Sequence, residues 1–439
     1  MNMVQIIAKK RDGNFLSKEE IAYVIKNYIN GKIPDYQVSA LLMAIYYMGL
    51  NDQEVFYLTE EMKNSGEVIN LSMIDGTKVD KHSTGGVGDK TTLIVAPIAA
   101  AAGVKIAKMS GRGLGFTGGT IDKLESIPGF NVTLTPEEFV SQVQNIGISV
   151  IGQSANIAAA DKLLYSLRDV TATVDSKGLI ASSIMSKKLA SGSDAIVLDV
   201  KYGSGAFMKE KDEALNLAEI MTKIGKAAGK NTVAVITNMD EPLGYNIGNS
   251  NEVIEAIEVL KGNGNKDLTK LSIVLASIMI LISGKVESLE EGENVAREMI
   301  KTKKALCKLK EMIESQGGNV DVIDDYSLFE SAKYEYKVYG PKGKYVKHIN
   351  SKLIGAASQL LGAGRSYKEE KIDMAAGVVL AKKVNDYIDC DEDTLIATLY
   401  SNKSREEIED AINMIEEAYV FDESKTQKPD IIYKIVGLK

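Results

Sequence analysis

Cysteine and long apolar runs are scarce in this sequence, and each scarcity excludes a class of protein. The two cysteines, Cys307 and Cys390, are too few for a disulfide framework or a zinc site and are typical of a reducing compartment. No apolar run reaches the roughly 18–20 residues that span a bilayer, and the longest, residues 271–283, is expected to form a buried helix. The first residues, MNMVQIIAKKRDG, lack the apolar segment and cleavage site of a signal peptide. We therefore expect a cytoplasmic protein with no membrane partner.

Basic residues and histidines are also few. The chain has 52 Lys and Arg against 60 Asp and Glu, a net charge of −8, whereas a general nucleic-acid surface needs a basic face. We therefore expect no nucleic-acid partner, although a locally positive pocket is compatible with this balance. Of the two histidines, His348 has no polar motif around it. His82 lies inside a glycine-rich loop and is the stronger functional candidate.

The 439 residues are enough for two or three domains, because a single core rarely grows beyond roughly 250–300 residues. Residues 14–65 have apolar positions at helical spacing, and Ser17 with Glu20 forms a capping-box pattern. After residue 76, short β-branched runs alternate with helical segments, which indicates an α/β domain with a mostly parallel sheet. The expected strands are 78–81, 104–109, 149–151, 194–200 and 232–237, and the expected helices are 91–102, 136–146, 211–228 and 251–260.

Two further helical stretches, 156–168 and 179–190, interrupt this alternation. We expect them to pack with the N-terminal helices, which makes the helical domain discontinuous in sequence. From about residue 334 the chain becomes rich in Tyr, Lys and Gly (YEYKVYGPKGKYV). The expected fold is a small all-helical domain (1–70 plus 155–192), a large α/β domain with a mostly parallel sheet (71–154 plus 193–333) and a C-terminal α+β domain (334–439).

The segment KHSTGGVGDKTT, residues 81–92, combines several features of an anion-binding loop. It lies between an expected strand and an expected helix, whose first N–H groups are unpaired. Its glycines let the backbone approach a ligand closely. Lys81 supplies positive charge, and the hydroxyls of Ser83, Thr91 and Thr92 add donors. A tight turn alone does not need this combination, and the spacing is not that of a Walker loop, so we predict an anion site.

A second glycine-rich segment, KMSGRGLGFTGGT at residues 108–120, follows the next expected strand. Three of its glycines match the dinucleotide pattern G-x-G-x-x-G, but that pattern alone is a weak signal. Two such loops at the carboxyl ends of adjacent strands are expected to converge on one small anion. Thr120 is either a helix cap or a donor to that anion, and Ser110 is either a turn hydroxyl or a donor.

A third group of polar residues lies on the two inserted helical stretches. Asp161, Tyr165 and Arg168 share one helical face, and Ser183 and Lys187 are four residues apart on the next helix. Such a face is either solvated surface or the wall of a polar pocket, and composition alone favours surface.

Several long motifs resemble those of thymidine and pyrimidine-nucleoside phosphorylases. The resemblance covers essentially the whole chain. It implies a homodimer whose subunits have a helical domain and an α/β domain separated by a cleft. It also implies phosphorolysis of pyrimidine nucleosides (uridine, thymidine and deoxyuridine) to free base and α-(deoxy)ribose 1-phosphate. The motifs are KHSTGGVGD at 81–89, SGRGLGFTGGTIDKLE at 110–125, SLRDVTATVDS at 166–176, SSIMSKKLASGSDAIVLDVKYGSGAF at 182–207, MDEPLGYNIGNSNEVIEAIEVL at 239–260 and IGAASQLLGAGR at 354–365.

By position, the resemblance assigns residues to each substrate and replaces the surface interpretation of the third group by a pocket wall. The phosphate-binding residues would be Lys81, Ser83, Thr92, Lys108, Ser110 and Thr120. The base-binding residues would be His82, Tyr165, Arg168, Ser183 and Lys187, among which His82, Arg168 and Lys187 are the expected catalytic groups. Inorganic phosphate is the implied co-substrate, and no organic cofactor is implied.

The choice within the family depends on Lys108, because strict thymidine phosphorylases of enteric bacteria typically have an apolar residue there. The resemblance to the broader enzymes also implies a monovalent-cation (K⁺) site. Its residues would be Gly88, Lys90, Leu243, Asn246 and Glu255. The sequence departs from the family at Lys90 and Asn246, where relatives usually have Thr and Ala. Carbonyl ligands would preserve the site, whereas the Lys90 ammonium would compete with the ion.

Another departure is Phe116, which replaces a frequent His in GLGHTGG and is expected to remove a polar contact near the cleft. Three other functions stay open at this stage. One is a strict thymidine phosphorylase, and another is a phosphoribosyltransferase of the anthranilate type, whose loops bind pyrophosphate with Mg²⁺. The last is a dinucleotide-binding module, in which Arg168 and Lys187 have no role.

Overall fold

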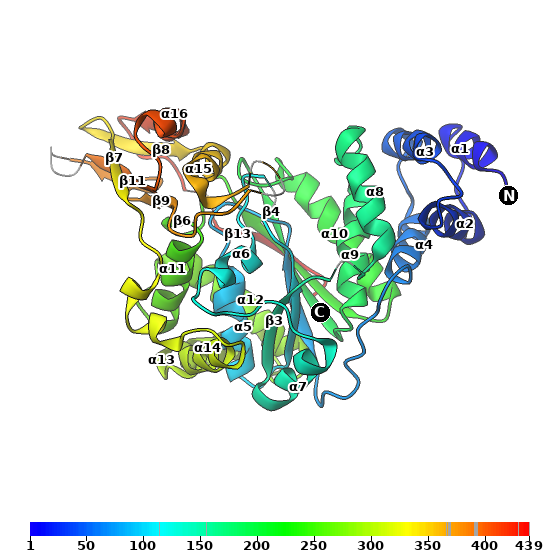
Figure 1. Cartoon of the computed structure of the whole chain (residues 1–439), viewed down its shortest axis with the longest axis horizontal. Helices are drawn as coiled ribbons and strands as arrows, with labels where there is room; N and C mark the ends of the chain where they lie inside the picture. Colours follow the sequence, from blue (N-terminus) through cyan, green and yellow to red (C-terminus); the bar gives the residue numbers. More distant parts are fainter. Residues whose placement is uncertain are drawn as a thin grey trace.

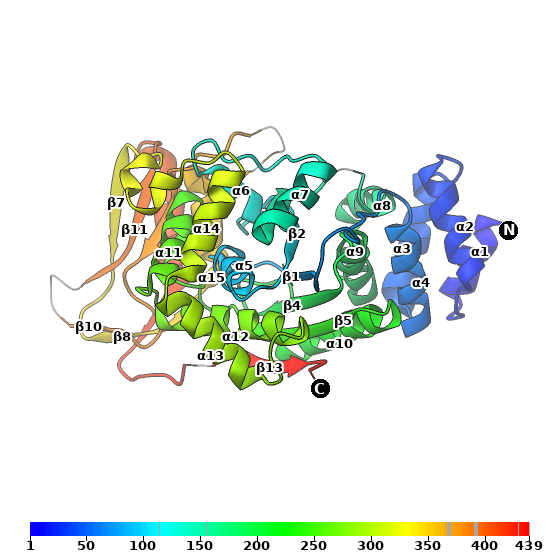
Figure 2. The ribbon, with the colours of Figure 1, turned by 90° about the horizontal axis from the view of Figure 1, so that it is seen from below.

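The computed structural model describes residues 1–113, 115–154, 156–365, 367, 370–389, 394–428 and 430–438. The described chain forms an N-terminal helical bundle, a central α/β domain and a C-terminal unit of antiparallel sheets (Figure 1). Figure 2 shows the bundle and the C-terminal unit at opposite ends of the α/β domain. The predicted fold class is therefore confirmed.

The N-terminal bundle contains α1 (Met3–Arg11), α2 (Lys18–Ile29), α3 (Asp35–Met48) and α4 (Asp52–Lys63). The predicted capping box is present, since Ser17 accepts from the Glu20 N–H and Glu20 from the Ser17 N–H. Helix α1 was not predicted. It is fixed by a buried ion pair between Lys10 and Glu54, 2.7 Å long, whose partners are too far apart in sequence for a local pattern.

The inserted helices α8 (Ala159–Val170) and α9 (Lys177–Ala190) pack on this bundle. Ala160, Leu164 and Leu179 share a core with residues of α1 to α4. Segments far apart in sequence therefore share one hydrophobic core. Helix α9 also contacts the α/β domain, because Ala181, Met185 and Leu189 lie in a core with strand residues.

The central sheet has the order β1 (Val79–Ser83), β4 (Ala195–Tyr202), β5 (Asn231–Asn238) and β13 (Ile432–Val436). Strands β1, β4 and β5 are parallel to one another. A separate parallel pair consists of β2 (Ile106–Ser110) and β3 (Ile148–Gly152), and a single bridge between Lys78 and Lys105 connects it to the start of β1. The carboxyl ends of β1 and β2, where the two glycine-rich loops begin, therefore lie on the same edge.

Helices cover both faces of this sheet. Along β4, Ile196 and Leu198 pack in one core with α10 (Lys211–Ala227). Val197 points to the opposite face, into a core shared with α5 and α12, as expected from the alternation of side chains along a strand. The helices of that layer are α5 (Thr91–Ala101), α6 (Thr120–Glu125), α11 (Ser250–Lys261), α12 (Lys266–Ile282), α13 (Leu289–Lys301) and α14 (Lys304–Ser315). Helix α7 (Pro136–Ile146) packs in a separate core with β2 and β3.

The C-terminal unit is built from two antiparallel sheets of order β6-β9-β11-β7 and β10-β8-β12. Strand β6 (Asn246–Gly248) belongs to the chain segment of the α/β domain, so this sheet joins the two units. The other elements are β7 (Tyr334–Tyr339), β8 (Lys344–Ile349), α15 (Ser351–Ser358), β9 (Gly377–Leu380), β10 (Tyr387–Ile388), β11 (Leu395–Ser401), α16 (Glu409–Ala418) and β12 (Tyr419–Asp422).

The expected C-terminal boundary needs a correction. The unit was expected to extend over 334–439, but β13 leaves it and pairs antiparallel with β5 of the central sheet. The pairing covers the open edge of β5, which local sequence patterns do not reveal.

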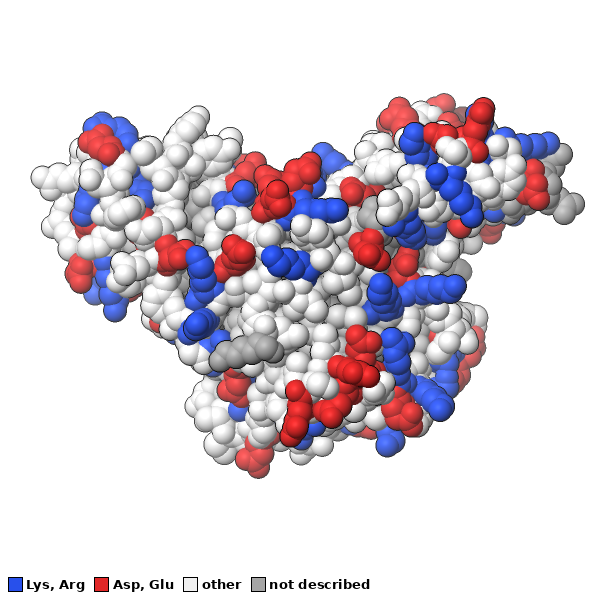
Figure 3. All heavy atoms as spheres, turned by 180° about the vertical axis from the view of Figure 1, so that it is seen from behind, with Lys and Arg blue, Asp and Glu red and all other residues white. Residues whose placement is uncertain are grey.

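Surface features agree with the charge balance of the sequence. On the face shown in Figure 3, Lys and Arg side chains lie among Asp and Glu side chains. Within the described ranges, no helix has both the length and the apolarity needed to cross a membrane. Cys307 is exposed and not in a disulfide, and Cys390 lies outside the described residues.

Candidate active site

The first glycine-rich loop connects β1 to α5 and holds a buried network of charges. The Lys81 ammonium donates to the Thr91 hydroxyl at 2.6 Å and lies 3.5 Å from Asp199. Thr91 in turn donates to Asp89 at 2.6 Å. Burial acts to raise the pKa of Asp89, but the Lys201 and Lys81 ammonium groups outweigh it and hold that pKa well below its usual range. Contacts among buried side chains therefore fix the conformation of this loop.

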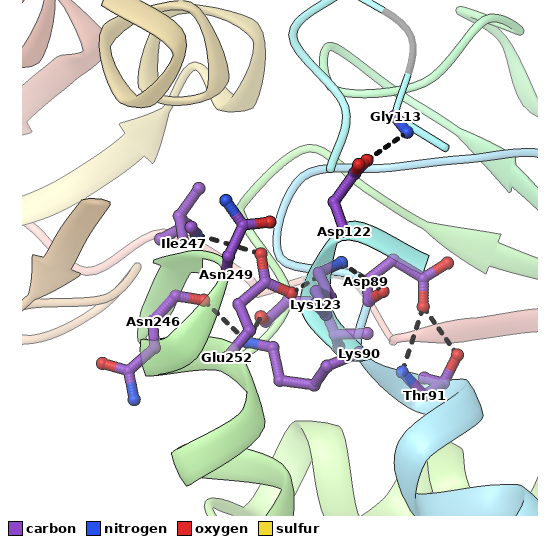
Figure 4. A network of polar contacts seen from close by, with 12 residues as sticks. Asp89, Lys90, Thr91, Gly113, Asp122, Lys123, Asn246, Ile247, Asn249 and Glu252 are labelled. Carbon is purple, nitrogen blue, oxygen red and sulfur yellow. Dashed lines mark hydrogen bonds and ion pairs between the residues drawn. The ribbon is translucent and has the colours of Figure 1, made fainter. Parts of the chain in front are cut away.

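The second glycine-rich loop connects β2 to α6 and folds back on itself. Asp122 of α6 accepts from the Gly113 N–H at 2.6 Å (Figure 4) and from Arg112 at 3.1 Å. A Cβ atom at Gly119 would lie 2.1 Å from the Gly113 nitrogen, so this close approach requires glycine. Gly119 is the N-cap of α6, and Thr120 is therefore not the helix cap that was one of its two expected roles.

Lys108 of β2 connects the strands that precede the two glycine-rich loops, because it contacts two residues of β1. Its ammonium donates to the Lys81 carbonyl and approaches Asp80 at 3.4 Å. The other oxygen of Asp80 accepts from Lys188 of α9 at 2.8 Å. Burial lowers the pKa of Lys108 to about 8, and the Asp80 carboxylate only partly opposes this effect. Lys108 is therefore a cation that can lose its proton close to neutral pH.

His82 follows Lys81 on β1. Burial, followed by the charges of Lys188 and Lys108, lowers its pKa well below the usual value. Its imidazole is thus neutral at pH 7 and carries a single N–H donor. The Nε2 atom is buried and has no hydrogen-bond partner among the described residues. Such an atom is available to a ligand.

Both loops line a cavity of about 210 Å³ at the carboxyl ends of β1 and β2. Five of the six residues expected to bind phosphate line it, namely Ser83, Thr92, Lys108, Ser110 and Thr120. Lys81 does not line it, because its ammonium is buried against Thr91 and Asp199. We interpret Lys81 as a support for the loop, and not as a direct ligand in this conformation.

All five residues expected to bind the base line a second, wider cavity of about 570 Å³. They are His82, Tyr165, Arg168, Ser183 and Lys187. Lys187 of α9 donates to Asp161 of α8 at 2.5 Å and to Ser183 at 3.0 Å. The polar faces of α8 and α9 therefore form a pocket wall, and the surface interpretation favoured by composition is wrong.

Arg168 is buried at the end of α8, and its guanidinium lies 5.8 Å from the centre of the Tyr165 ring. It donates to the carbonyls of Thr173, Val174 and Leu179. A guanidinium has five N–H donors, so this arrangement occupies three and leaves two. Arg168 both fixes the turn between α8 and α9 and retains donors for a ligand.

The two cavities form one cleft. Both are lined by His82, Arg112, Gln153, Ile184, Lys187 and Phe207, among others. The narrow end is rich in hydroxyls, glycines and lysines, and the wide end combines apolar surface with Arg168, Ser183 and Lys187. A small anion at one end and a flat polar ring at the other would lie next to each other, with His82 between them.

The residues mapped to a cation site also lie together, but they do not fit a separate ion. The Lys90 ammonium donates to the carbonyls of Leu243 and Asn246 at 2.9 and 2.7 Å and to Glu255 at 2.5 Å (Figure 4 shows the contact with Asn246). Lys90 therefore supplies a cation and not an oxygen ligand, which corrects its expected role. The sequence departure at Lys90 was the signal for this difference.

Phe116 lies away from both cavities of the cleft. It packs against the core of the C-terminal unit, and a Cβ atom at Gly355 of α15 would lie 2.6 Å from its carbonyl oxygen. Its expected effect on a polar contact inside the cleft is thus not supported, because its side chain connects the second loop to α15.

Several site residues were not predicted from sequence. Asp80 and Lys188 form a pair whose members are distant in the chain and carry no motif. Asp199 and Lys201 had a usable signal, since two charges interrupt the otherwise apolar strand AIVLDVKY, and both are fully buried. Charges on a buried strand near its carboxyl end point to a site at that end.

Comparisons with known proteins agree with this architecture. Residues 4–66 match the family model for the helical bundle domain of a glycosyl transferase family, and residues 75–306 match the model for its a/b domain. Residues 345–422 match the pyrimidine nucleoside phosphorylase C-terminal domain.

Full-length relatives and a solved structure extend the comparison. The chain is 51% identical over 436 residues to a pyrimidine-nucleoside phosphorylase from Staphylococcus epidermidis, with 99% of this chain and 100% of the relative covered. It is 51% identical over 433 residues to the one from Geobacillus stearothermophilus, with 99% of each covered. Anthranilate phosphoribosyltransferase from Thermus thermophilus has a similar fold, with a TM-score of 0.58 at 20% identity, over 71% of this chain and 98% of that one. At the identities of the full-length relatives, the chain belongs to the pyrimidine-nucleoside phosphorylase family.

Proposed function

We propose that this protein cleaves pyrimidine nucleosides with inorganic phosphate, giving the free base and α-(deoxy)ribose 1-phosphate. The observation that carries the proposal is the single cleft with a narrow end lined by hydroxyls, glycines and lysines and a wide, partly apolar end, which share His82 and Lys187. The full-length relatives named as pyrimidine-nucleoside phosphorylases support it.

In this proposal, phosphate binds in the narrow end. The hydroxyls of Ser83, Ser110 and Thr120 and the N–H groups of the loops donate to its oxygens, and Lys108 supplies charge. Holding the phosphate in place converts a bimolecular attack into an effectively unimolecular one, which lowers the barrier by several kcal/mol. Lys81 does not contact the phosphate in this proposal, and it contributes by holding the first glycine-rich loop in shape.

The wide end stabilises the departing base. Negative charge develops on the pyrimidine carbonyls as the glycosidic bond breaks, and donors fixed beforehand at those positions lower the barrier. Arg168 and Lys187 bring positive charge, and the neutral His82 ring donates a hydrogen bond. Phosphate attacks the anomeric carbon on the face opposite the base, so the configuration inverts and the β-nucleoside gives the α-phosphate. Since the groups come from different domains, closure of the cleft precedes the chemistry.

The substrate range in this proposal includes uridine, thymidine and deoxyuridine. Lys108 supports the broad range, because strict thymidine phosphorylases typically have an apolar residue at this position. Measuring uracil or thymine release from the three nucleosides with phosphate tests this point. Turnover of thymidine and deoxyuridine without uridine would indicate a strict thymidine phosphorylase.

The same assay separates phosphorolysis from the phosphoribosyltransferase alternative. That alternative is considered because the fold is similar to that of the Thermus enzyme. Uridine with phosphate is compared with anthranilate or uracil plus phosphoribosyl pyrophosphate and Mg²⁺. We expect base release only in the first mixture, and ³¹P NMR should identify a sugar 1-phosphate of α configuration. Pyrophosphate release in the second mixture without base release in the first would overturn the proposal.

We further propose a homodimer that forms through the N-terminal helices. Tyr36, Met43 and Tyr47 of α3 are exposed, with 73%, 37% and 78% of their surface accessible. At spacings of seven and eleven residues they share one face, and an apolar stripe of this kind marks an interaction surface. Sedimentation of the wild type and of Tyr47→Glu tests this, with a dimer expected for the first and a smaller species for the second.

A further inference from the structure

Lys90 ends in a pocket of oxygen atoms that has the composition of a cation site. The residue is the N-cap of α5, and 1% of its surface is exposed. Its ammonium has three N–H donors, and three oxygens accept from it, the carbonyls of Leu243 and Asn246 and one oxygen of Glu255. Each donor therefore has a partner.

The charge in this pocket is balanced without an ion. Glu255 accepts from the N–H groups of Tyr245 and Asn246 at 2.8 and 3.0 Å and from Asn265 at 2.8 Å. These partners are neutral, so Lys90 supplies the positive charge that directly contacts the carboxylate. A second cation in the same pocket would be repelled by the ammonium, because two like charges in a buried site are poorly screened.

The pocket lies where the first glycine-rich loop meets the segment 243–246. The Leu243 N–H donates to the Val87 carbonyl at 3.0 Å. Gly88 has a φ of +74°, and a Cβ atom there would lie 2.5 Å from the Leu243 carbonyl oxygen. Asn246 then begins β6, which pairs with β9 of the C-terminal unit. One ammonium thus connects the anion-binding loop to the strand that joins the two units.

We propose that the Lys90 ammonium is a covalently tethered replacement for a monovalent cation, and that this enzyme keeps its loop geometry without K⁺. Lys90 is a positioning residue, because it does not line the cleft. The proposal rests on the contacts of Lys90 and holds whichever nucleoside the cleft binds.

The test measures thermal unfolding in KCl and in choline chloride at equal ionic strength. The wild type should have the same Tm in both salts. Lys90→Thr removes the ammonium and leaves the Glu255 carboxylate with neutral donors only, so its Tm should fall in choline chloride. It should then rise by roughly 2–4 °C or more in KCl, because binding to the folded state alone stabilises it.

A matched control is available in Lys383, another buried lysine that donates to carbonyls of the same segment, those of Pro242 and Gly244. Lys383→Thr should lower the Tm equally in both salts, because Glu241, the carboxylate 3.6 Å from Lys383, keeps its ion pair with Lys428 and needs no other cation. A wild-type Tm that rises specifically with KCl would overturn the proposal, and this measurement needs no variant. An equal loss of Tm in both salts for Lys90→Thr would also overturn it, since the ammonium would then be an ordinary structural donor.

Discussion

Lys188 of α9 and Asp80 of β1 form a buried ion pair of 2.8 Å that connects the helical side of the cleft to its narrow end. The preceding residue of α9, Lys187, points instead to Asp161 and Ser183 in the wall of the wide cavity. Consecutive residues on a helix differ by about 100° in direction. One turn of α9 therefore serves both ends of the cleft.

Replacing Lys188 by Met should destabilise the fold and weaken phosphate binding. Asp80 would keep only the longer contact with Lys108, and the loss of one partner of a buried pair costs on the order of 3 kcal/mol. Denaturant unfolding and the KM for phosphate measure the two effects. Lys223→Met is the control, because its pair with Asp52 lies on the surface, where such pairs contribute little. Equal stabilities of the two variants would contradict the role given to Lys188.

Phosphate binding should weaken as pH rises through about 8. The pKa of Lys108 is lowered to about 8, chiefly by burial, so its charge is present below that pH and lost above it. The KM for phosphate should therefore rise above pH 8 in the wild type, and the ratio of wild-type to Lys108→Met KM should change there. Ionisation of the substrates affects both proteins equally and cancels in this ratio.

The lowered pKa of Lys108 weakens phosphate binding as the pH rises, but it has the opposite effect on the stability of the fold. Between about pH 8 and the usual lysine value, the unfolded chain binds more protons at this position than the folded one, so stability gained from Lys108 rises with pH. The difference in unfolding free energy between wild type and Lys108→Met should shift in favour of the wild type over this range. A shift in the other direction would show that Lys108 stays charged.

His82→Gln should lower kcat by roughly ten- to a hundredfold, the effect of one hydrogen bond to a charged group. Because the pKa of His82 is held well below its usual value, the wild-type kcat should show no inflection near pH 6.5 from this residue. On acidification below about pH 6.5 the unfolded chain takes up a proton that the folded one does not. Stability should then fall more steeply in the wild type than in His82→Gln.

Arg168→Ala should raise the KM for uridine and lower the Tm together, because the side chain holds three carbonyls and lines the base pocket. The KM for phosphate is the internal control and should change little. Arg168→Lys keeps the charge but not the planar fork, and should restore part of the Tm. Unchanged uridine kinetics in Arg168→Ala would remove Arg168 from the site.

Local patterns were sufficient for much of the fold. Helix α7 begins and ends at the predicted residues, because Thr135 and Glu138 form a capping box and Pro136 begins the helix. The five strands of the α/β domain are all present within a few residues of their predicted bounds. These elements are encoded by neighbours in sequence, as caps and β-branched runs.

Features that depend on distant partners were not predictable in the same way. Lys10 with Glu54 and Lys188 with Asp80 are buried pairs separated by 44 and 108 residues. The pocket wall on α8 and α9 looks like a solvated face until α9 is seen to pack against the central sheet. In the first loop, the sequence predicted an anion site, but it did not indicate that Lys81 is buried beneath the loop.

Strand β13 returns to β5 after the C-terminal unit is complete, so that unit is an insertion whose two ends both connect to the α/β domain. Any rotation of the unit must bend two chain connections at once. Cutting the chain between β12 and β13 would release this constraint and free the last strand. It would also expose the unpaired backbone of β5, a template on which strands of other molecules can add, so limited proteolysis there should convert the enzyme into an aggregating species.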